Sequence, residues 1–427
     1  MKPTSFLTAA AILPALLGAA CLQGADAAPA PAQAQPPAAV VSSDLAHCRA
    51  GAQVALWDKT LTVRQIDMLP CIDNSYTRLF RWDAFENPKL AQLRRQEKLD
   101  DVVTGATDEF DRMVRLLDWA HHRFKRIGRP DYMEKDHVTP QTIKKEPRGA
   151  LEIVANIDQG GTYGCIECGQ LLVSTLNSFG YVARLLCLKK AVGFGKNEGA
   201  QEHTVAEVWS NQYRKWVMVD AKYALYIENQ KGVPLNAWEL RGDWFYRLGQ
   251  GLVCVFDKDR TKRTKADFPV FRADYKTAYG SDSYTLAFGA DNEMYKYAHI
   301  GYIPNNNCMD EGPDYDHMFI SQDEICHHTN WLPSRRRAGS PGVDPYFPIN
   351  QAALSLAPGE SGKLHVAIST LTPNFKTFQV RLDGTEWKDA GSTLAWELHD
   401  GANKLEARSV NKWDVPGPVS TVELELK

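Results

Sequence analysis

Three side chains occur along the chain in the order Cys165, His203 and Asp220, and together they have the chemistry of nucleophilic acyl transfer. A cysteine thiolate attacks a carbonyl carbon, an imidazole carries the proton to the leaving group, and a carboxylate orients the imidazole. Cys165 follows a glycine-rich turn, residues 160–164, and is expected to begin a helix. The unpaired N–H groups and the positive dipole end of a helix start favour the thiolate. The set predicts a nucleophilic cysteine that acts on an amide through a thioester.

Two apolar stripes at helical spacing predict the helices near this site. The first follows Cys165 and is expected to stop at Gly180; its members are Cys168, Leu171, Leu172, Thr175, Leu176 and Phe179. The second predicts an amphipathic helix that ends at Gly128; its members are Phe110, Met113, Val114, Leu117, Ala120 and Phe124. His121 and His122 are adjacent near the end of this second helix, do not share a face, and are expected to be partly solvated.

Three short strands are expected to complete the site. Residues 183–188 have the pattern of a buried strand, and residues 203–209 and 216–220 that of an antiparallel pair joined by a turn. His203 begins one strand of this pair and Asp220 ends the other, so lateral contact between their side chains is expected.

Several motifs in this segment follow a recognisable order. They are Gly164-Cys165, then Gly180-Tyr181-Val182-Ala183-Arg184, then His203 with Glu207-Val208-Trp209, and finally Trp216-Val217-Met218-Val219-Asp220. In this order, and with 15 positions from Cys165 to Gly180, they resemble the transglutaminase-like superfamily of cysteine enzymes over about residues 100–240. The resemblance implies an α+β fold, a papain-like core of a helix plus an antiparallel sheet. It also implies Cys165 as nucleophile, His203 as general base and acid, and Asp220 as the orienting carboxylate.

An oxyanion hole needs a donor besides the backbone N–H of Cys165. Gln159 lies six residues upstream, the separation that papain-type enzymes use for their glutamine donor, and is the candidate. Two positions depart from the family pattern: Glu202 precedes the histidine where a small residue is common, and Ala221 follows the aspartate where proline is frequent. Neither departure removes a catalytic group.

The resemblance implies an enzyme that acts on peptide or amide bonds, more by hydrolysis than by cross-linking, because many bacterial relatives look like proteases or amidases. Its substrate would be a peptide, a protein, or an amide-bearing cell-wall or glycan component. The alternative from another class is an inert transglutaminase-like binding or scaffold protein at the cell surface. No cofactor is expected. The acidic run of residues 310–316 could instead bind calcium, and Cys165 with Cys168 could form a redox or zinc half-site.

The two ends of the chain differ in character from its middle. Residues 1–27 have the pattern of a signal peptide, although Cys21 also fits a lipoprotein signal that ends before it, and residues 28–44 form an Ala/Pro-rich linker. Export to the periplasm or the exterior is therefore expected, with an outer-membrane lipid anchor as the alternative. The transglutaminase-like domain is expected over residues 45–345, with an irregular, aromatic-rich extension from about residue 240. Six β-type runs over residues 346–427 predict a small all-β sandwich, immunoglobulin-like or fibronectin-III-like.

The composition limits the partners. Lys and Arg total 49 against 52 Asp and Glu, and the mean hydropathy is −0.37, so neither nucleic-acid binding nor a polytopic membrane protein is indicated. Membrane contact would come only from an N-terminal lipid. Nine cysteines suit an exported protein. Disulfides are expected between Cys48 and Cys71 and between Cys308 and Cys326, with unpaired thiols at Cys168, Cys187 and Cys254, which leaves about two bridges.

Overall fold

The computed structural model describes residues 44–128, 130–133, 146–190, 202–247, 249–264, 297–314, 318–322, 337–341 and 344–427. The predicted signal peptide, Cys21 and nearly all of the predicted linker lie outside these residues. Within the described part, no helix is both long enough and apolar enough to cross a membrane.

A nine-stranded sheet carries two of the predicted site residues, His203 and Asp220. Its strand order is β13-β12-β10-β4-β5-β6-β7-β8-β9, and all neighbours are antiparallel except β12 and β13, which are parallel. The strands are β4 (Ala183–Lys190), β5 (Glu202–Ser210), β6 (Lys215–Asp220), β7 (Leu225–Asn229), β8 (Leu252–Phe256), β9 (Thr261–Thr264), β10 (Tyr297–Tyr302), β12 (Phe319–Gln322) and β13 (Arg337–Pro341). A separate parallel pair joins β3 (Arg81–Trp82) to β11 (Asn305–Asn306).

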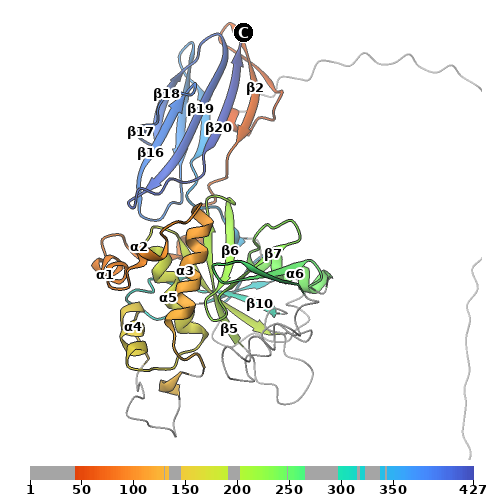
Figure 1. The fold of residues 1–427 in the computed structure, drawn as a ribbon. Coiled ribbons are helices and arrows are strands. Elements are labelled where there is room, and N and C mark those ends of the chain that lie inside the picture. The colour runs from red at the N-terminus through yellow and green to blue at the C-terminus, as the bar shows by residue number, and fades with distance from the viewer. Residues whose placement is uncertain are drawn as a thin grey trace, which may run out of the picture. The chain divides into compact units, whose positions relative to one another are not determined.

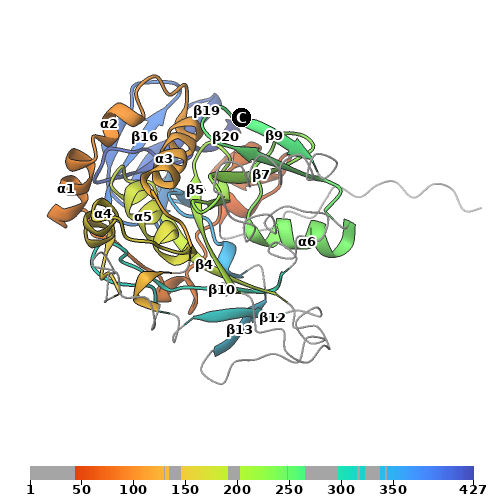
Figure 2. The same ribbon diagram turned by 60° about the horizontal axis from the view of Figure 1, so that its bottom comes forward.

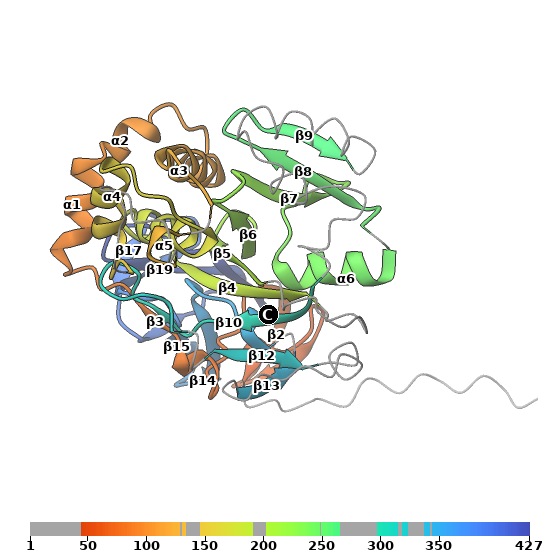
Figure 3. The same cartoon turned by 90° about the horizontal axis from the view of Figure 1, so that it is seen from below.

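Six helices accompany the sheet in the described part of the chain. They are α1 (Pro88–Gln96), α2 (Leu99–Val102), α3 (Glu109–Arg123), α4 (Ala150–Asp158), α5 (Cys165–Asn177) and α6 (Ala237–Arg247). Helix α5 contacts α1, α3, α4 and the strands β4 and β5, so it is covered on most of its surface (Figure 2). Helix α6 lies apart from the other helices (Figure 3).

The sheet is buried on both faces because its apolar side chains alternate between two cores. On β4, Leu185 and Cys187 belong to the cluster that contains the apolar residues of α3 and α5. Leu186 and Leu188 belong to a second cluster, which contains Leu240 and other residues of α6. Burial on both faces explains why these strands have nearly continuous apolar sequences.

The helices and strands predicted around the site are present with small differences in length. Helix α5 starts at Cys165, as expected, and ends at Asn177 instead of Phe179. Helix α3 ends at Arg123, five residues before Gly128, and its start is capped by Asp108, whose side chain accepts the N–H of Asp111 at 2.8 Å. The three predicted strands correspond to β4, β5 and β6.

Two further antiparallel sheets share one hydrophobic cluster in the C-terminal part of the chain. The six-stranded sheet has the order β1-β2-β20-β19-β16-β17 and the three-stranded sheet the order β14-β15-β18. Their strands are β1 (Gln53–Leu56), β2 (Lys59–Asp67), β14 (Ala353–Pro358), β15 (Lys363–Ser369), β16 (Phe375–Leu382), β17 (Lys388–Ala390), β18 (Thr393–Glu397), β19 (Gly401–Asn411) and β20 (Ser420–Leu426). All six runs predicted in this region are strands.

The domain boundaries expected from the sequence require two corrections. Residues 45–67 are expected in the transglutaminase-like domain, but β2 pairs with β20, at the other end of the chain (Figure 1). Leu61 and Val63 of β2 are fully buried in the C-terminal cluster, and the pairing covers an otherwise open strand edge. The extension from about residue 240 is not irregular in its described parts, because it supplies α6 and five strands of the central sheet, β8, β9, β10, β12 and β13.

Candidate active site

Cys165 is the first residue of α5, and the turn before it is held by Glu167 on the first turn of the helix. The N–H of Gly164 donates to Glu167 Oε2 at 2.9 Å. The hydroxyl of Tyr132 donates to the other oxygen of the same carboxylate. Burial raises the pKa of Glu167, against the hydrogen bonds from Tyr132 and from the backbone. The start of the helix is thereby tied to the segment that follows α3, which fixes the position of the sulfur.

His203 and Asp220 form a buried pair on the neighbouring strands β5 and β6. His203 Nε2 lies 2.6 Å from Asp220 Oδ2, and the two residues are 3% and 0% exposed. Ala206 pairs with Val219, so the same register puts Asp220 across from Val205, two residues from His203 and on the same face of the sheet. The His203 side chain also acts on the thiol of Cys165 through its charge and hydrogen-bonding capacity, which brings the three predicted residues into one site.

The three groups shift one another's protonation toward an ion pair. Burial alone would raise the pKa of the Cys165 thiol, but the hydrogen bond and charge of His203, together with the charge of Lys222, lower it to about 7. Burial alone would lower the pKa of His203, but the charge and hydrogen bond of Asp220 raise it to about 9. Between these values the thiolate and the imidazolium coexist, which is the reactive form of a cysteine nucleophile.

Two residues that sequence reasoning did not place at the site surround the turn after Asp220. His121 of α3 is buried, contrary to the expectation that it is partly solvated, and its Nδ1 lies 2.9 Å from the carbonyl oxygen of Ala221. Burial lowers the pKa of His121 to about 4, so the ring is neutral and donates to that carbonyl. Tyr223 is also buried, with its ring centroid 5.5 Å from that of His203. Helical spacing shows only that His121 and His122 face different directions; which of them meets the sheet depends on tertiary packing.

Gln159, the predicted oxyanion donor, is not in a position that supports this role. It follows α4 directly as the C-cap residue, its side chain is exposed, and its Nε2 donates to Ala155 O at 3.3 Å on the same helix. His203 and Asp220, in contrast, are buried. Gln159 does lie six positions before Cys165, but this spacing does not show that the residue ends a separate helix, α4.

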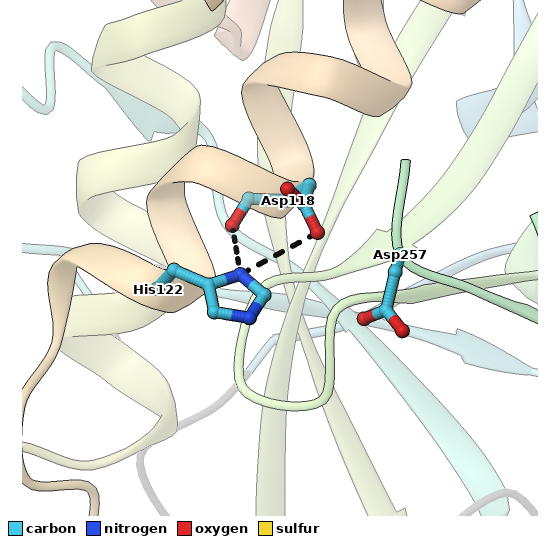
Figure 4. Close-up of side chains that lie close together, drawn as sticks. All are labelled: Asp118, His122 and Asp257. Atoms are coloured by element: carbon cyan, nitrogen blue, oxygen red, sulfur yellow. Dashed lines mark hydrogen bonds and ion pairs between the residues drawn. The ribbon is translucent and has the colours of Figure 1, made fainter. Parts of the chain in front are cut away.

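One group of side chains in the described part of the chain could hold a metal ion. Asp118 and His122 of α3 and Asp257, which follows β8, bring one ligand atom each within 4.8 Å of one another (Figure 4). His122 Nδ1 lies 2.9 Å from the carbonyl oxygen of Asp118 and 3.4 Å from its Oδ1. His122 is exposed, as expected from the sequence, and this group lies outside the Cys165 site.

The acidic run considered for calcium has other partners where it is described. Asp310 forms an ion pair with Lys89 and accepts a hydrogen bond from Asn87 Nδ2 at 2.5 Å. Glu311 accepts a hydrogen bond from Asn305. Residues 315 and 316 lie outside the described part of the chain.

The cysteines are less paired than expected. Cys48 and Cys71 are both free thiols, so the predicted bridge between them is wrong. This pair is predicted because the two cysteines are close in sequence and lie in loops. In the structure Cys48 follows a short 3₁₀ turn that packs on β14, and the strands β1 and β2 lie between Cys48 and Cys71 along the chain. Cys308 is a free buried thiol, and its predicted partner Cys326 lies outside the described residues. The thiols predicted to be unpaired, Cys168, Cys187 and Cys254, are free and buried.

Comparison with known proteins leaves the family open. No family model and no curated protein match the chain. Among solved structures, a Cytophaga hutchinsonii protein described as "a Putative Cysteine Protease" is similar with a TM-score of 0.23 and 11% sequence identity. The match covers 41% of this chain and 52% of that chain, so it spans about half of the solved protein. A likeness at this level is too weak to indicate a function.

Proposed function

We propose that this protein is a cysteine enzyme with a papain-like, transglutaminase-like core that cleaves amide bonds by acyl transfer through a thioester on Cys165. The observation that carries the proposal is the buried His203–Asp220 pair, 2.6 Å apart, beside a thiol at the first position of α5. This chemistry uses a cysteine as nucleophile, a histidine that transfers the proton, and a carboxylate that orients the histidine.

The proposed reaction has two steps. The thiolate of Cys165 attacks the amide carbonyl carbon, the C–N bond breaks, and the imidazolium of His203 gives its proton to the departing amine. The neutral imidazole then removes a proton from water, which attacks the thioester; the C–S bond breaks, the carboxylic acid leaves, and the Cys165 thiolate and the His203 imidazolium are restored. Asp220 holds the imidazole in position throughout. Negative charge develops on the carbonyl oxygen in each step, and the N–H groups at the start of α5 are in the class of donors that could receive it.

Hydrolysis is the favoured outcome of this proposal. Water needs no binding site of its own, whereas cross-linking needs an amine bound beside the thioester. The substrate class is a peptide, a protein, or an amide-bearing cell-wall or glycan component. We further propose that the N-terminal segment directs export, with cleavage after residue 27 or lipidation at Cys21, and that the C-terminal sheets form an immunoglobulin-like or fibronectin-III-like sandwich that helps to hold the substrate.

The test compares the wild type with Cys165→Ala and with a matched control, Cys71→Ala, which removes a half-buried thiol on a different part of the chain. Each protein is incubated with a peptide library and, separately, with a glutamine-containing protein and a labelled amine. We expect cleavage products that depend on Cys165 and not on Cys71, with a thioester on Cys165 trapped by acid quenching and detected by mass spectrometry. Amine incorporation without cleavage would favour cross-linking. If neither turnover nor an adduct depends on Cys165, the protein is an inert binding module.

A further inference from the structure

A lysine lies in the turn that directly follows the proposed catalytic aspartate. Lys222 is between β6 and β7, and its backbone N–H donates to Asp220 Oδ1 at 2.9 Å. The other oxygen of the same carboxylate, Oδ2, holds His203. One carboxylate therefore orients the imidazole and fixes the backbone of Lys222, so the position of the lysine is tied to that of the site.

The ammonium group of Lys222 lies near the ring of Tyr223, which in turn lies beside His203. Its Nζ lies 5.3 Å from the ring centroid of Tyr223, and that ring is 5.5 Å from the ring of His203, tilted by 55°. Lys222 is half-buried, whereas His203 and Tyr223 are buried. In addition, the positive charge of Lys222 contributes to lowering the pKa of Cys165.

The charges at the site indicate what this lysine could recognise. In the ion-pair form the Cys165 thiolate and the Asp220 carboxylate carry two negative charges against the one positive charge of His203. These groups alone would repel an anionic substrate. A lysine ammonium is a compact charge with three donors on a flexible stem, which suits a carboxylate whose position is not fixed by the protein.

We propose that Lys222 is a specificity-determining residue that favours amide substrates with a carboxylate close to the scissile bond. This inference rests on the function proposed above for Cys165. The substrate class narrows from any amide to amides of acidic residues, such as peptides with glutamate, aspartate or a free α-carboxylate next to the cleaved bond. A merely structural lysine, packed through its stem against Tyr223, would leave charge selectivity unchanged when it is replaced.

The test uses two alkylating reagents of nearly the same size that differ in charge, so that only one of them should be attracted by the ammonium group of Lys222. Iodoacetamide is neutral and iodoacetate is anionic, so the ratio of their rates at Cys165 measures the local field independently of the reactivity of the thiol. Rates are measured on the full chain at pH 7.5 and low salt, with the Cys165 peptide quantified by mass spectrometry. The variants are Lys222→Gln, Lys222→Arg and, as a matched change of charge in the C-terminal sheet, Lys388→Gln on β17.

We expect the iodoacetate-to-iodoacetamide ratio to fall about fivefold in Lys222→Gln, the size of one unit charge acting at about 4 Å in water. Lys222→Arg and Lys388→Gln should keep the wild-type ratio, and salt near 1 M should remove the difference, since the screening length is then about 3 Å. An unchanged ratio in Lys222→Gln, with fast iodoacetamide labelling retained, overturns the role of Lys222 and leaves the proposed function intact. Slow iodoacetamide labelling of the wild type that does not depend on His203 overturns both.

Discussion

The protonation of Cys165 gives the sharpest test of the site, through the effect of His203→Ala on the pH dependence of alkylation. In the wild type the pKa of Cys165 is lowered to about 7 by the hydrogen bond and charge of His203, against the effect of burial. The thiolate therefore forms as the pH rises through about 7. Without the imidazole, the two largest causes of the lowered pKa are removed and burial still opposes ionisation, so the pKa should return to near the ordinary thiol value of about 8.5.

The expected magnitude follows from these two values. At pH 6 a thiol with a pKa near 7 is about one-tenth ionised, and one with a pKa near 8.5 about one part in three hundred, a ratio of about 30. A less basic thiolate is a weaker nucleophile, by about fivefold for a difference of 1.5 pKa units. The wild type should therefore react with iodoacetamide about sixfold faster than His203→Ala at pH 6. By pH 10, where both thiols are ionised, this advantage should be lost, and the more basic thiolate of His203→Ala should react up to about fivefold faster.

The assay quenches the reaction at set times and quantifies the alkylated Cys165 peptide by mass spectrometry, because Cys48 and Cys71 are also half-buried free thiols and would confuse a bulk measurement. His203→Gln is the second variant, since it keeps most of the buried volume and separates loss of the imidazole from local collapse. Identical profiles for the wild type and both variants, each with a midpoint near 8.5, would refute the ion-pair reasoning.

Two further predictions concern Asp220 and the buried ion pair of Arg184 with Glu207. Asp220→Asn removes the charge that raises the pKa of His203 to about 9, so the alkaline limit of amide turnover should move toward pH 6.5. Turnover at pH 8 should fall about 30-fold, because the protonated fraction of the imidazole decreases by that factor. An unchanged alkaline limit would exclude His203 as the acid. Arg184→Met should lower the free energy of unfolding by about 3–5 kcal/mol, because it leaves the buried carboxylate of Glu207 without its cation. The control, Arg381→Met, breaks a partly exposed ion pair and should cost about 1 kcal/mol or less in urea unfolding; equal losses in the two variants would contradict the argument from burial.

The sequence predicts those parts of the site that depend on local periodicity. Helix α5 starts at Cys165 because a glycine turn precedes an apolar stripe, and β5 and β6 are recognisable as short, largely apolar runs joined by a polar turn. Contacts made across long separations were not predictable in this way. Gln159 is exposed because α4 ends there, and nothing in its spacing from Cys165 shows that helix.

Strand pairing between distant segments was missed for the same reason. Strand β2 has the alternation of a half-buried strand, but the sequence does not identify its partner, which is β20 more than 350 residues later. The same applies to Lys222. Its place near the site depends on the turn after Asp220, where its N–H binds the Asp220 carboxylate and the ring of Tyr223 lies beside His203. Lysine in a turn is ordinary, so its type and position carry no signal until the register of β5 and β6 is known.

The register between β4 and β5 is stabilised by a buried ion pair near the other end of β5. A slip of one residue between strands turns every side chain to the opposite face, so the geometry of His203 and Asp220 requires a single pairing of β4, β5 and β6. Arg184 of β4 pairs directly with Glu207 of β5, with Nε and Nη2 at 3.1 and 2.8 Å from Oε2, and both residues are fully buried. The hydroxyl of Tyr346 donates to the other oxygen of Glu207 at 3.0 Å. A slipped register would leave these charges buried without partners, at a cost of several kcal/mol. The ion pair therefore acts on the chemistry from a distance, because it excludes slipped pairings of β4 and β5 and so fixes the face of the sheet on which His203 lies relative to β4.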